Sequence, residues 1–216
     1  MTALPAALSA KAAYALLASD YDRAPNALVS LEQRTLAPLL PPLAGKTVID
    51  VAAGTGRWAA YCSARAARAL AIDSCREMLE HSISPAIQAD AARLPLPDSV
   101  ADLTICAFAL GYAPACFTEL ARITRPGGTL LISDVHPNAL ASGWTRSFRH
   151  NGSVIEVAHE RYALADLRAP ELQLTTLEEP HLGHPEREIY ATAGRLDLFH
   201  QARLVPAIFV ASWIKT

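Results

Sequence analysis

Short apolar runs alternate with amphipathic stretches through the middle of the chain. The apolar runs are short, rich in Val, Ile, Leu and Ala, and bounded by turn residues, so they predict buried strands. Their ranges are 47–51, 69–73, 86–90, 101–110 and 129–135. The stretches between them predict helices over 57–67, from a Ser74-x-x-Glu77 capping box to His81, and from Pro114 to Thr124. This alternation predicts an α/β fold with a parallel sheet and helices on both faces.

The two ends of the chain follow other patterns. Residues 9–18 and 26–40 predict helices ahead of the first strand, and Pro41-Pro42 stops the second of them. Beyond the fifth strand, Asn151-Gly152 predicts a two-residue hairpin. Two late strands (171–179 and 207–214) and a helix (193–204) complete the expected elements.

We therefore expect a Rossmann-like domain with a seven-strand, mostly parallel sheet that has one antiparallel strand. The expected parts of this single domain are an N-terminal helical cap (1–45), a ligand-binding core (46–137), a hairpin or lid insertion (138–170) and C-terminal strands with a helix (171–216).

Composition narrows the class of protein. The chain has 216 residues, of which 51% are hydrophobic and 19% charged, which excludes global disorder. A net charge of -2 gives no basic surface for nucleic acid. Cys62, Cys75, Cys106 and Cys116 lie in apolar segments without a C-x-x-C pair, so we expect buried reduced thiols and no metal site. The N-terminal stretch is interrupted by polar residues and has no positive region before its apolar part. We expect a cytoplasmic monomer or homodimer with no membrane partner.

The stretch "VIDVAAGTGRWAA" (48–60) carries the main functional signal. Its glycine spacing, Gly54-x-Gly56-x-x-Ala59, fits the dinucleotide fingerprint, and the same letters fit the loop that binds S-adenosylmethionine (SAM). Asp50 favours SAM, because a carboxylate beside a pyrophosphate is repelled by roughly 4 kcal/mol, whereas SAM presents an ammonium and a sulfonium. Asp73, at the end of the second strand, suits the ribose of either ligand.

Two further features disfavour a dinucleotide. No tyrosine has a lysine four residues on, as in short-chain dehydrogenases, and there is little room for the second domain that other dehydrogenases need. In addition, a mostly helical segment precedes the first strand, whereas dinucleotide-binding folds usually begin with that strand.

Four stretches together resemble the class I SAM-dependent methyltransferases, in the small-molecule branch related to quinone-biosynthesis methyltransferases. They are "VIDVAAGTGR", "AIDSCREML", "QADAARLPLPDSVADLTICAFAL" and "ELARITRPGGTLLISDVHP", and the resemblance covers roughly residues 10 to 137. It implies SAM as cofactor, S-adenosylhomocysteine as product and methyl transfer as the reaction. Ala52 stands where many members have Gly.

The resemblance also implies roles for single residues. Asp50 and the backbone of 52–56 would hold the methionine end, Asp73 the ribose and Asp90 the adenine amino group. The Ala91 N–H would meet a ring nitrogen, Phe108 would line the methionine side, and Tyr14 or Tyr21 would close over the cofactor. The full expected set is Asp50, Ala52, Ala53, Gly54, Gly56, Tyr21, Asp73, Ser74, Asp90, Ala91 and Phe108.

The sequence indicates the methyl acceptor less clearly than it indicates the cofactor. His136 follows the fifth strand in "SDVHP", at the carboxyl end where open α/β sheets bind ligands, so it is the first candidate for a general base and His159 the second. The stretch "AFALGY" lacks the N/D-P-P-Y/F platform of nucleic-acid amine methyltransferases. We therefore expect a small, partly apolar acceptor that is methylated on oxygen rather than on nitrogen or carbon, and no nucleic-acid substrate. Two alternatives stay open: a SAM-binding enzyme that does not methylate, such as a cyclase, and an NAD-dependent oxidoreductase.

Overall fold

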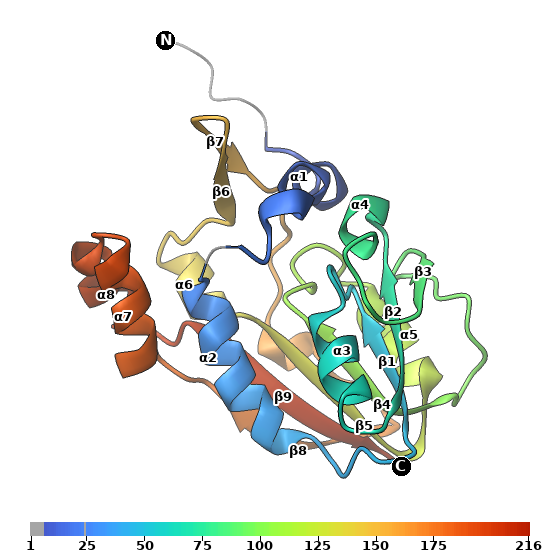
Figure 1. Cartoon of the computed structure of the whole chain (residues 1–216). Coiled ribbons are helices and arrows are strands. Elements are labelled where there is room, and N and C mark those ends of the chain that lie inside the picture. Colours follow the sequence, from blue (N-terminus) through green and yellow to red (C-terminus); the bar gives the residue numbers. More distant parts are fainter. Residues whose placement is uncertain (1–6, 24) are drawn as a thin grey trace.

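A seven-stranded sheet runs through the molecule, with helices on both of its faces, in the computed structural model of the chain (Figure 1). The structure describes residues 7–23 and 25–216. The strand order is β3-β2-β1-β4-β5-β9-β8. The strands are β1 (Thr47–Val51), β2 (Arg68–Asp73), β3 (Ala86–Gln88), β4 (Ala101–Ala107), β5 (Thr124–Val135), β8 (Leu172–Glu178) and β9 (Ile208–Lys215). Only β9 runs antiparallel to its neighbours in this sheet, so the predicted sheet with one antiparallel strand is confirmed.

The central strands are buried on both faces, which is why their sequences are continuously apolar. Alternate residues of β1 enter different clusters: Val48 packs in the cluster that holds α2 (Ala27–Leu36) and α3 (Arg57–Ser63). Ile49 packs in the cluster of α5 (Cys116–Ile123). Packing on both faces holds these parallel strands in place. Their carboxyl ends therefore lie at one edge of the sheet, where the loops that follow them meet.

Three predicted boundaries in the core are wrong for local reasons. Helix α3 ends at Ser63, and Ala66 takes a left-handed φ of 63° before β2. Strand β4 ends at Ala107 because Phe108 also takes a positive φ, of 59°. Pro114 lies ahead of α5 rather than in its first turn.

The predicted capping box of the next helix is also wrong. Helix α4 (Arg76–Leu79) has Cys75, not Ser74, at its N-cap. The Cys75 N–H donates to Asp73 Oδ1 at 2.8 Å, and Glu77 accepts from Cys75 Sγ at 3.3 Å. Asp73 takes over the capping function because it ends the preceding strand beside these groups.

The N-terminal cap consists of α1 (Ala10–Leu17) and α2, each followed by a short 3-10 turn (Ala18–Asp20 and Ala37–Leu39). Both helices were expected, and Ser9 and Asn26 cap them through their side chains. Helix α7 (His184–Thr192) was not predicted from the sequence, and it packs on α2. The last helix, α8 (Leu196–Ala202), lies within the predicted range.

The predicted hairpin is present as β6 (Ser147–His150) and β7 (Ser153–Glu156). Asn151 and Gly152 both have positive φ, 47° and 79°, as a tight two-residue hairpin turn requires. A short unpredicted helix, α6 (Pro137–Ala141), separates it from β5. The chain after β7 then pairs with the N-terminal segment, where the Ala158 N–H donates to the Leu8 carbonyl at 2.7 Å. Figure 1 shows the hairpin and α1 on the same side of the molecule. Among the described residues, no helix has the length and apolar character needed to cross a membrane.

Candidate active site

The loop after β1 has a backbone that only small residues tolerate. Ala52, Gly54 and Gly56 all take positive φ, at 54°, 57° and 78°. A Cβ on Gly56 would lie 2.4 Å from Ser82 Oγ, so the Ser82 side chain would have to move, and the positive φ itself favours glycine there. The Gly54 N–H donates to Asp73 Oδ2 at 2.8 Å, which ties the loop to the end of β2.

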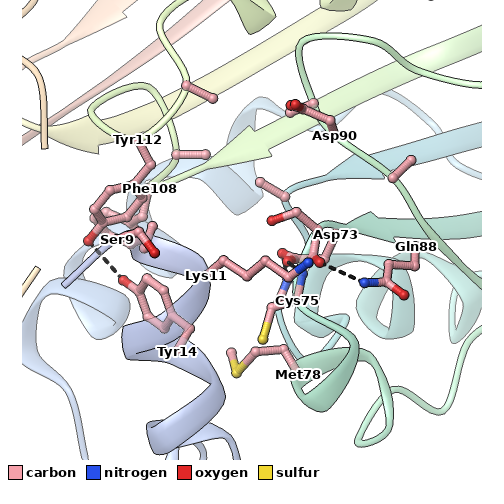
Figure 2. Close-up of a pocket in the computed structure, with 18 of the residues that line it drawn as sticks. Ser9, Lys11, Tyr14, Asp73, Cys75, Met78, Gln88, Asp90, Phe108 and Tyr112 are labelled. Carbon is pink, nitrogen blue, oxygen red and sulfur yellow. Dashed lines mark hydrogen bonds between the residues drawn. The ribbon is translucent and has the colours of Figure 1, made fainter. Parts of the chain in front are cut away.

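A cavity of about 630 Å³ opens beside this loop, at the carboxyl ends of β1, β2 and β4 (Figure 2). This volume is in the range of small-molecule sites. Its walls come from the loop, from the residues that follow β2, β3 and β4, and from the N-terminal cap. The lining residues are Ser9, Ala10, Lys11, Tyr14, Tyr21, Ala52, Gly54, Asp73, Ser74, Cys75, Met78, Gln88, Ala89, Asp90, Ala91, Ala107, Phe108, Ala109, Tyr112 and Ala113.

Most of the residues expected to bind a cofactor meet at this cavity. Eight of the eleven line it: Tyr21, Ala52, Gly54, Asp73, Ser74, Asp90, Ala91 and Phe108. The Asp73 carboxylate is held by two backbone N–H donors, and burial raises its pKa from the ordinary value. Asp90 is exposed and accepts from the Ala92 N–H at 2.9 Å. In Figure 2 Asp90, Asp73 and Gln88 lie on one side of the cavity, and Tyr14, Phe108 and Tyr112 on the other.

Asp50, Ala53 and Gly56 are absent from the cavity wall. Asp50 is 2% exposed and accepts a hydrogen bond from the Ala59 N–H at 2.8 Å, so it braces the start of α3 beneath the loop. Burial raises the pKa of this carboxyl to about 7, and the bond from Ala59 opposes that shift. A direct contact between Asp50 and a ligand stays a prediction.

The raised pKa makes Asp50 a source of pH-dependent stability. An acid that binds its proton more tightly when folded stabilises the fold fully below its unfolded pKa of 3.8, and the contribution disappears as the pH rises through about 7. We expect Asp50→Asn to remove this pH dependence. Between about pH 5 and 7, the free energy of unfolding of the wild type should therefore fall by about 1.4 kcal/mol per pH unit relative to that of the variant. Urea unfolding across this pH range measures the difference. Parallel pH profiles would contradict the expectation, and Asp197→Asn, at an exposed site, serves as the control.

The two histidines proposed as bases lie off the cavity wall. His136 is 3% exposed and caps α6: its Nδ1 accepts from the Asn138 N–H at 3.0 Å, so Nε2 carries the proton and donates to Glu179 Oε1 at 2.7 Å. His159 is half-buried in the segment after β7, with Nδ1 3.2 Å from the Val157 carbonyl oxygen. Neither ring is brought to the cavity, and among the described lining residues there is no histidine.

Several wall residues were missed by sequence reasoning. Lys11, Met78, Gln88 and Tyr112 line the cavity, but no contact with a ligand was predicted for them, although Met78 and Gln88 lie in stretches that carry the resemblance. Tyr112 stands in "AFALGY", a stretch from which only the lack of an amine platform was inferred. Its place after β4, at the carboxyl edge of the sheet, was the available signal.

Comparison with known proteins agrees with this geometry. The family profile described as "Methyltransferase domain" matches residues 49–132, which run from β1 through the loop into β5. The chain is 31% identical over 145 residues to a malonyl-[acyl-carrier protein] O-methyltransferase of Pectobacterium atrosepticum, a match that covers 62% of this chain and 57% of that protein. The match assigns residues 49–132 to a methyltransferase domain, in agreement with the resemblance to class I SAM-dependent methyltransferases.

Two further methyltransferases match less of the chain or match it with lower identity. A demethylmenaquinone methyltransferase of Corynebacterium kroppenstedtii is 34% identical over 101 residues, which is 44% of each protein. A putative SAM-dependent methyltransferase from Listeria monocytogenes has a similar fold, with a TM-score of 0.69 and 19% identity over 88% of this chain and 98% of that one. The chain thus spans about half the length of the curated relatives it matches.

The chemistry of the cavity fits SAM, the cofactor that the resemblance implies. A positively charged sulfonium nucleoside needs hydrogen-bond acceptors for its ribose, and Asp73 presents a carboxylate to the cavity. The glycine loop allows a ligand to approach its backbone closely, because no side chain projects from Gly54. The cavity offers acids rather than the cluster of N–H groups and cations that a pyrophosphate needs, since Lys11 is the only Lys or Arg among the described lining residues.

Proposed function

We propose that this protein transfers a methyl group from SAM to an oxygen atom of a small-molecule acceptor. The observation that carries the proposal is the convergence of the glycine loop, Asp73 and Asp90 on one cavity at the carboxyl edge of the sheet. Bound there, SAM supplies an electrophilic methyl group. The protein's part is to bind, orient and shield the reactants, and proximity of this kind contributes roughly 7–11 kcal/mol to methyl transfer.

The lining residues fall into a cofactor-binding group and an acceptor-binding group according to the side of the cavity on which they lie. Asp73 would hold the ribose and Asp90 the adenine, which leaves the side formed by Tyr14, Phe108 and Tyr112 for the acceptor. The N-terminal cap contributes Ser9 and Tyr14 to the cavity wall, and it pairs through Leu8 with Val157 in the segment after β7. The name of the relative from Pectobacterium atrosepticum, an O-methyltransferase, supports oxygen as the acceptor atom.

Two measurements test the proposal. Titration calorimetry with SAM and with NAD distinguishes the two cofactor classes, and we expect binding of SAM alone. Transfer of labelled methyl from SAM to a panel of phenols, carboxylic acids and amines then tests the reaction, and we expect labelled oxygen products. Tight SAM binding without transfer to any of these acceptors would favour a SAM-binding enzyme of another kind, such as a cyclase. Binding of NAD without SAM would refute the proposal.

His136 bears on the mechanism because sequence analysis made it the first candidate base. In the structure both of its ring nitrogens are engaged, so we expect His136→Ala to cost about 1–2 kcal/mol of stability through the lost cap and the lost hydrogen bond to Glu179. SAM affinity should stay unchanged, and His136→Asn should recover part of the stability, since asparagine is a good N-cap. Urea unfolding and calorimetry measure these effects. A loss of roughly 10²–10⁴-fold in turnover with unchanged stability would instead establish His136 as the base.

A further inference from the structure

The acceptor side of the cavity contains a pair of tyrosine hydroxyls. Tyr14, in α1, and Tyr112, after β4, both line the cavity, and their hydroxyl oxygens are 3.0 Å apart (Figure 2). The rings meet edge to face, with centroids 5.6 Å apart. The pair therefore joins two segments that are 98 residues apart in the chain, at the point where the cap covers the sheet.

Charged groups behind Tyr112 hold it in place. Arg146 lies with its guanidinium carbon 4.5 Å from the centre of the Tyr112 ring, and it is paired with the buried carboxylate of Asp134. Asp134 also accepts from the Gly111 N–H at 3.0 Å, and Arg146 Nη1 donates to the Phe108 carbonyl at 3.1 Å. Burial disfavours the charge on Arg146, but Asp134 and Tyr112 raise its pKa above the ordinary value, so it stays a cation. A cation offers only donors, so it accepts no proton from Tyr112.

One of the two hydroxyl protons of the tyrosine pair takes no part in the hydrogen bond between the two hydroxyls. Each hydroxyl carries one proton, and a single hydrogen bond between them consumes one of the two. Among the described residues neither hydroxyl has an acceptor other than its partner. Burial raises the pKa of Tyr14 well above its ordinary value, so this hydroxyl keeps its proton at neutral pH. One O–H donor is left over, at the cavity.

The same side of the cavity lacks a group that would deprotonate an acceptor. No histidine lines it among the described residues, and residues 1–6 and 24 contain none in the sequence. Asp73 and Asp90 lie on the opposite side, where the nucleoside is proposed to bind. An acceptor that keeps its proton at neutral pH would therefore find no base among the described residues of this side to remove that proton.

From these observations, and resting on the proposed methyl transfer, we infer that the Tyr14–Tyr112 pair binds an acceptor oxygen that is already anionic, a carboxylate or an acidic phenolate. The spare O–H donates to this oxygen or to its neighbour in the same group. A lone pair of the acceptor oxygen forms the new bond to the methyl carbon, while the carbon–sulfur bond breaks and its electron pair stays on sulfur. The anion and the sulfonium become a neutral ester or ether and a neutral thioether, and no proton has to be removed.

The test measures binding of anionic probes to the full chain saturated with S-adenosylhomocysteine, which prevents turnover. The probes are benzoate and, in mildly alkaline buffer, 4-nitrophenolate, with benzyl alcohol as the neutral probe; ligand-observed NMR titration gives their dissociation constants. We expect at least one anion to bind, and Tyr14→Phe and Tyr112→Phe each to weaken it by about tenfold. The anion that binds and responds to the substitutions tells carboxylate from phenolate.

Matched controls separate this inference from the proposed function. Tyr190→Phe, at a ring that packs on Phe199 in the last two helices, should leave anion binding unchanged. Benzyl alcohol should respond to the tyrosine substitutions by less than about twofold. S-adenosylhomocysteine is titrated into each variant first, so that every comparison of anion binding is made on the saturated protein. If S-adenosylhomocysteine binds but the anions do not, or if both phenylalanine variants bind the anions as tightly as the wild type does, the inference is wrong while the proposed function stands. If the wild type does not bind S-adenosylhomocysteine, both fall.

Discussion

Replacing Glu32 with alanine should lower the free energy of unfolding by about 3–5 kcal/mol. Glu32, in α2, is completely buried, yet it accepts three hydrogen bonds. They come from Arg57 Nη2 at 2.6 Å, Trp58 Nε1 at 2.9 Å and Ser133 Oγ at 3.0 Å. One carboxylate thus joins the cap to the start of α3 and to β5. Its removal leaves three donors without a partner next to the cofactor loop, and one of them is charged.

Thermal and urea unfolding measure this effect, and a melting temperature about 10 °C lower is the corresponding expectation. Glu32→Gln should cost less, because its amide oxygen still accepts from Trp58 and Ser133 while the charge opposite Arg57 is lost. Glu80→Ala is the matched control: Glu80 pairs with Arg76 at the surface, with both side chains more than half exposed, and should change stability by less than about 0.5 kcal/mol. A loss for Glu32→Ala as small as for Glu80→Ala would show that water replaces the buried carboxylate.

The sheet could be predicted from the sequence because its central strands are buried on both faces. Val48 and Ile49 face opposite clusters, so the whole run had to be apolar and could be found by pattern alone. The same holds for the hairpin, since Asn151 and Gly152 both tolerate positive φ. Helix α7 could not be found in this way. It is held to α2 by Glu186, which is buried and accepts from Ser30, Arg34 and Gly183, and a buried acid does not mark a core position in a sequence pattern.

The site was predictable where one short segment carries it. Gly54 and Asp73 belong to a loop and a strand end whose spacing follows from the fold, so both could be placed at a ligand from the sequence. Tyr14 and Tyr112 belong to no local motif, because their pairing depends on how the cap folds over the sheet. His136 shows the opposite error. Its position after β5 was consistent with a general base, but its ring points away from the cavity and bonds to Asn138 and Glu179. This orientation depends on side-chain packing, which the sequence pattern does not show.

Among the lining residues, Asp73 is the one whose replacement should weaken cofactor binding most. Its carboxylate lines the cavity and, within residues 7–23 and 25–216, is the only side chain that bonds the glycine loop at Gly54, so it would both hold the ribose and keep the loop in place. We expect Asp73→Ala to weaken SAM binding by about 2–3 kcal/mol, roughly 30- to 150-fold in Kd, because charge-assisted hydrogen bonds are lost. Titration calorimetry measures this, with Asp197→Ala, at an exposed and distant carboxylate, as the control that should leave Kd unchanged.

A double-mutant cycle separates ribose binding from loop support. The wild type should bind adenosine more tightly than 2′-deoxyadenosine by about tenfold, because the missing hydroxyl leaves the Asp73 carboxylate with one partner fewer. In Asp73→Ala this preference should disappear, since neither nucleoside then finds the carboxylate. If Asp73 only supported the loop through Gly54 and Cys75, both nucleosides would lose the same affinity and the preference would survive the substitution. A surviving preference would therefore assign the ribose to another group and reduce Asp73 to a structural role.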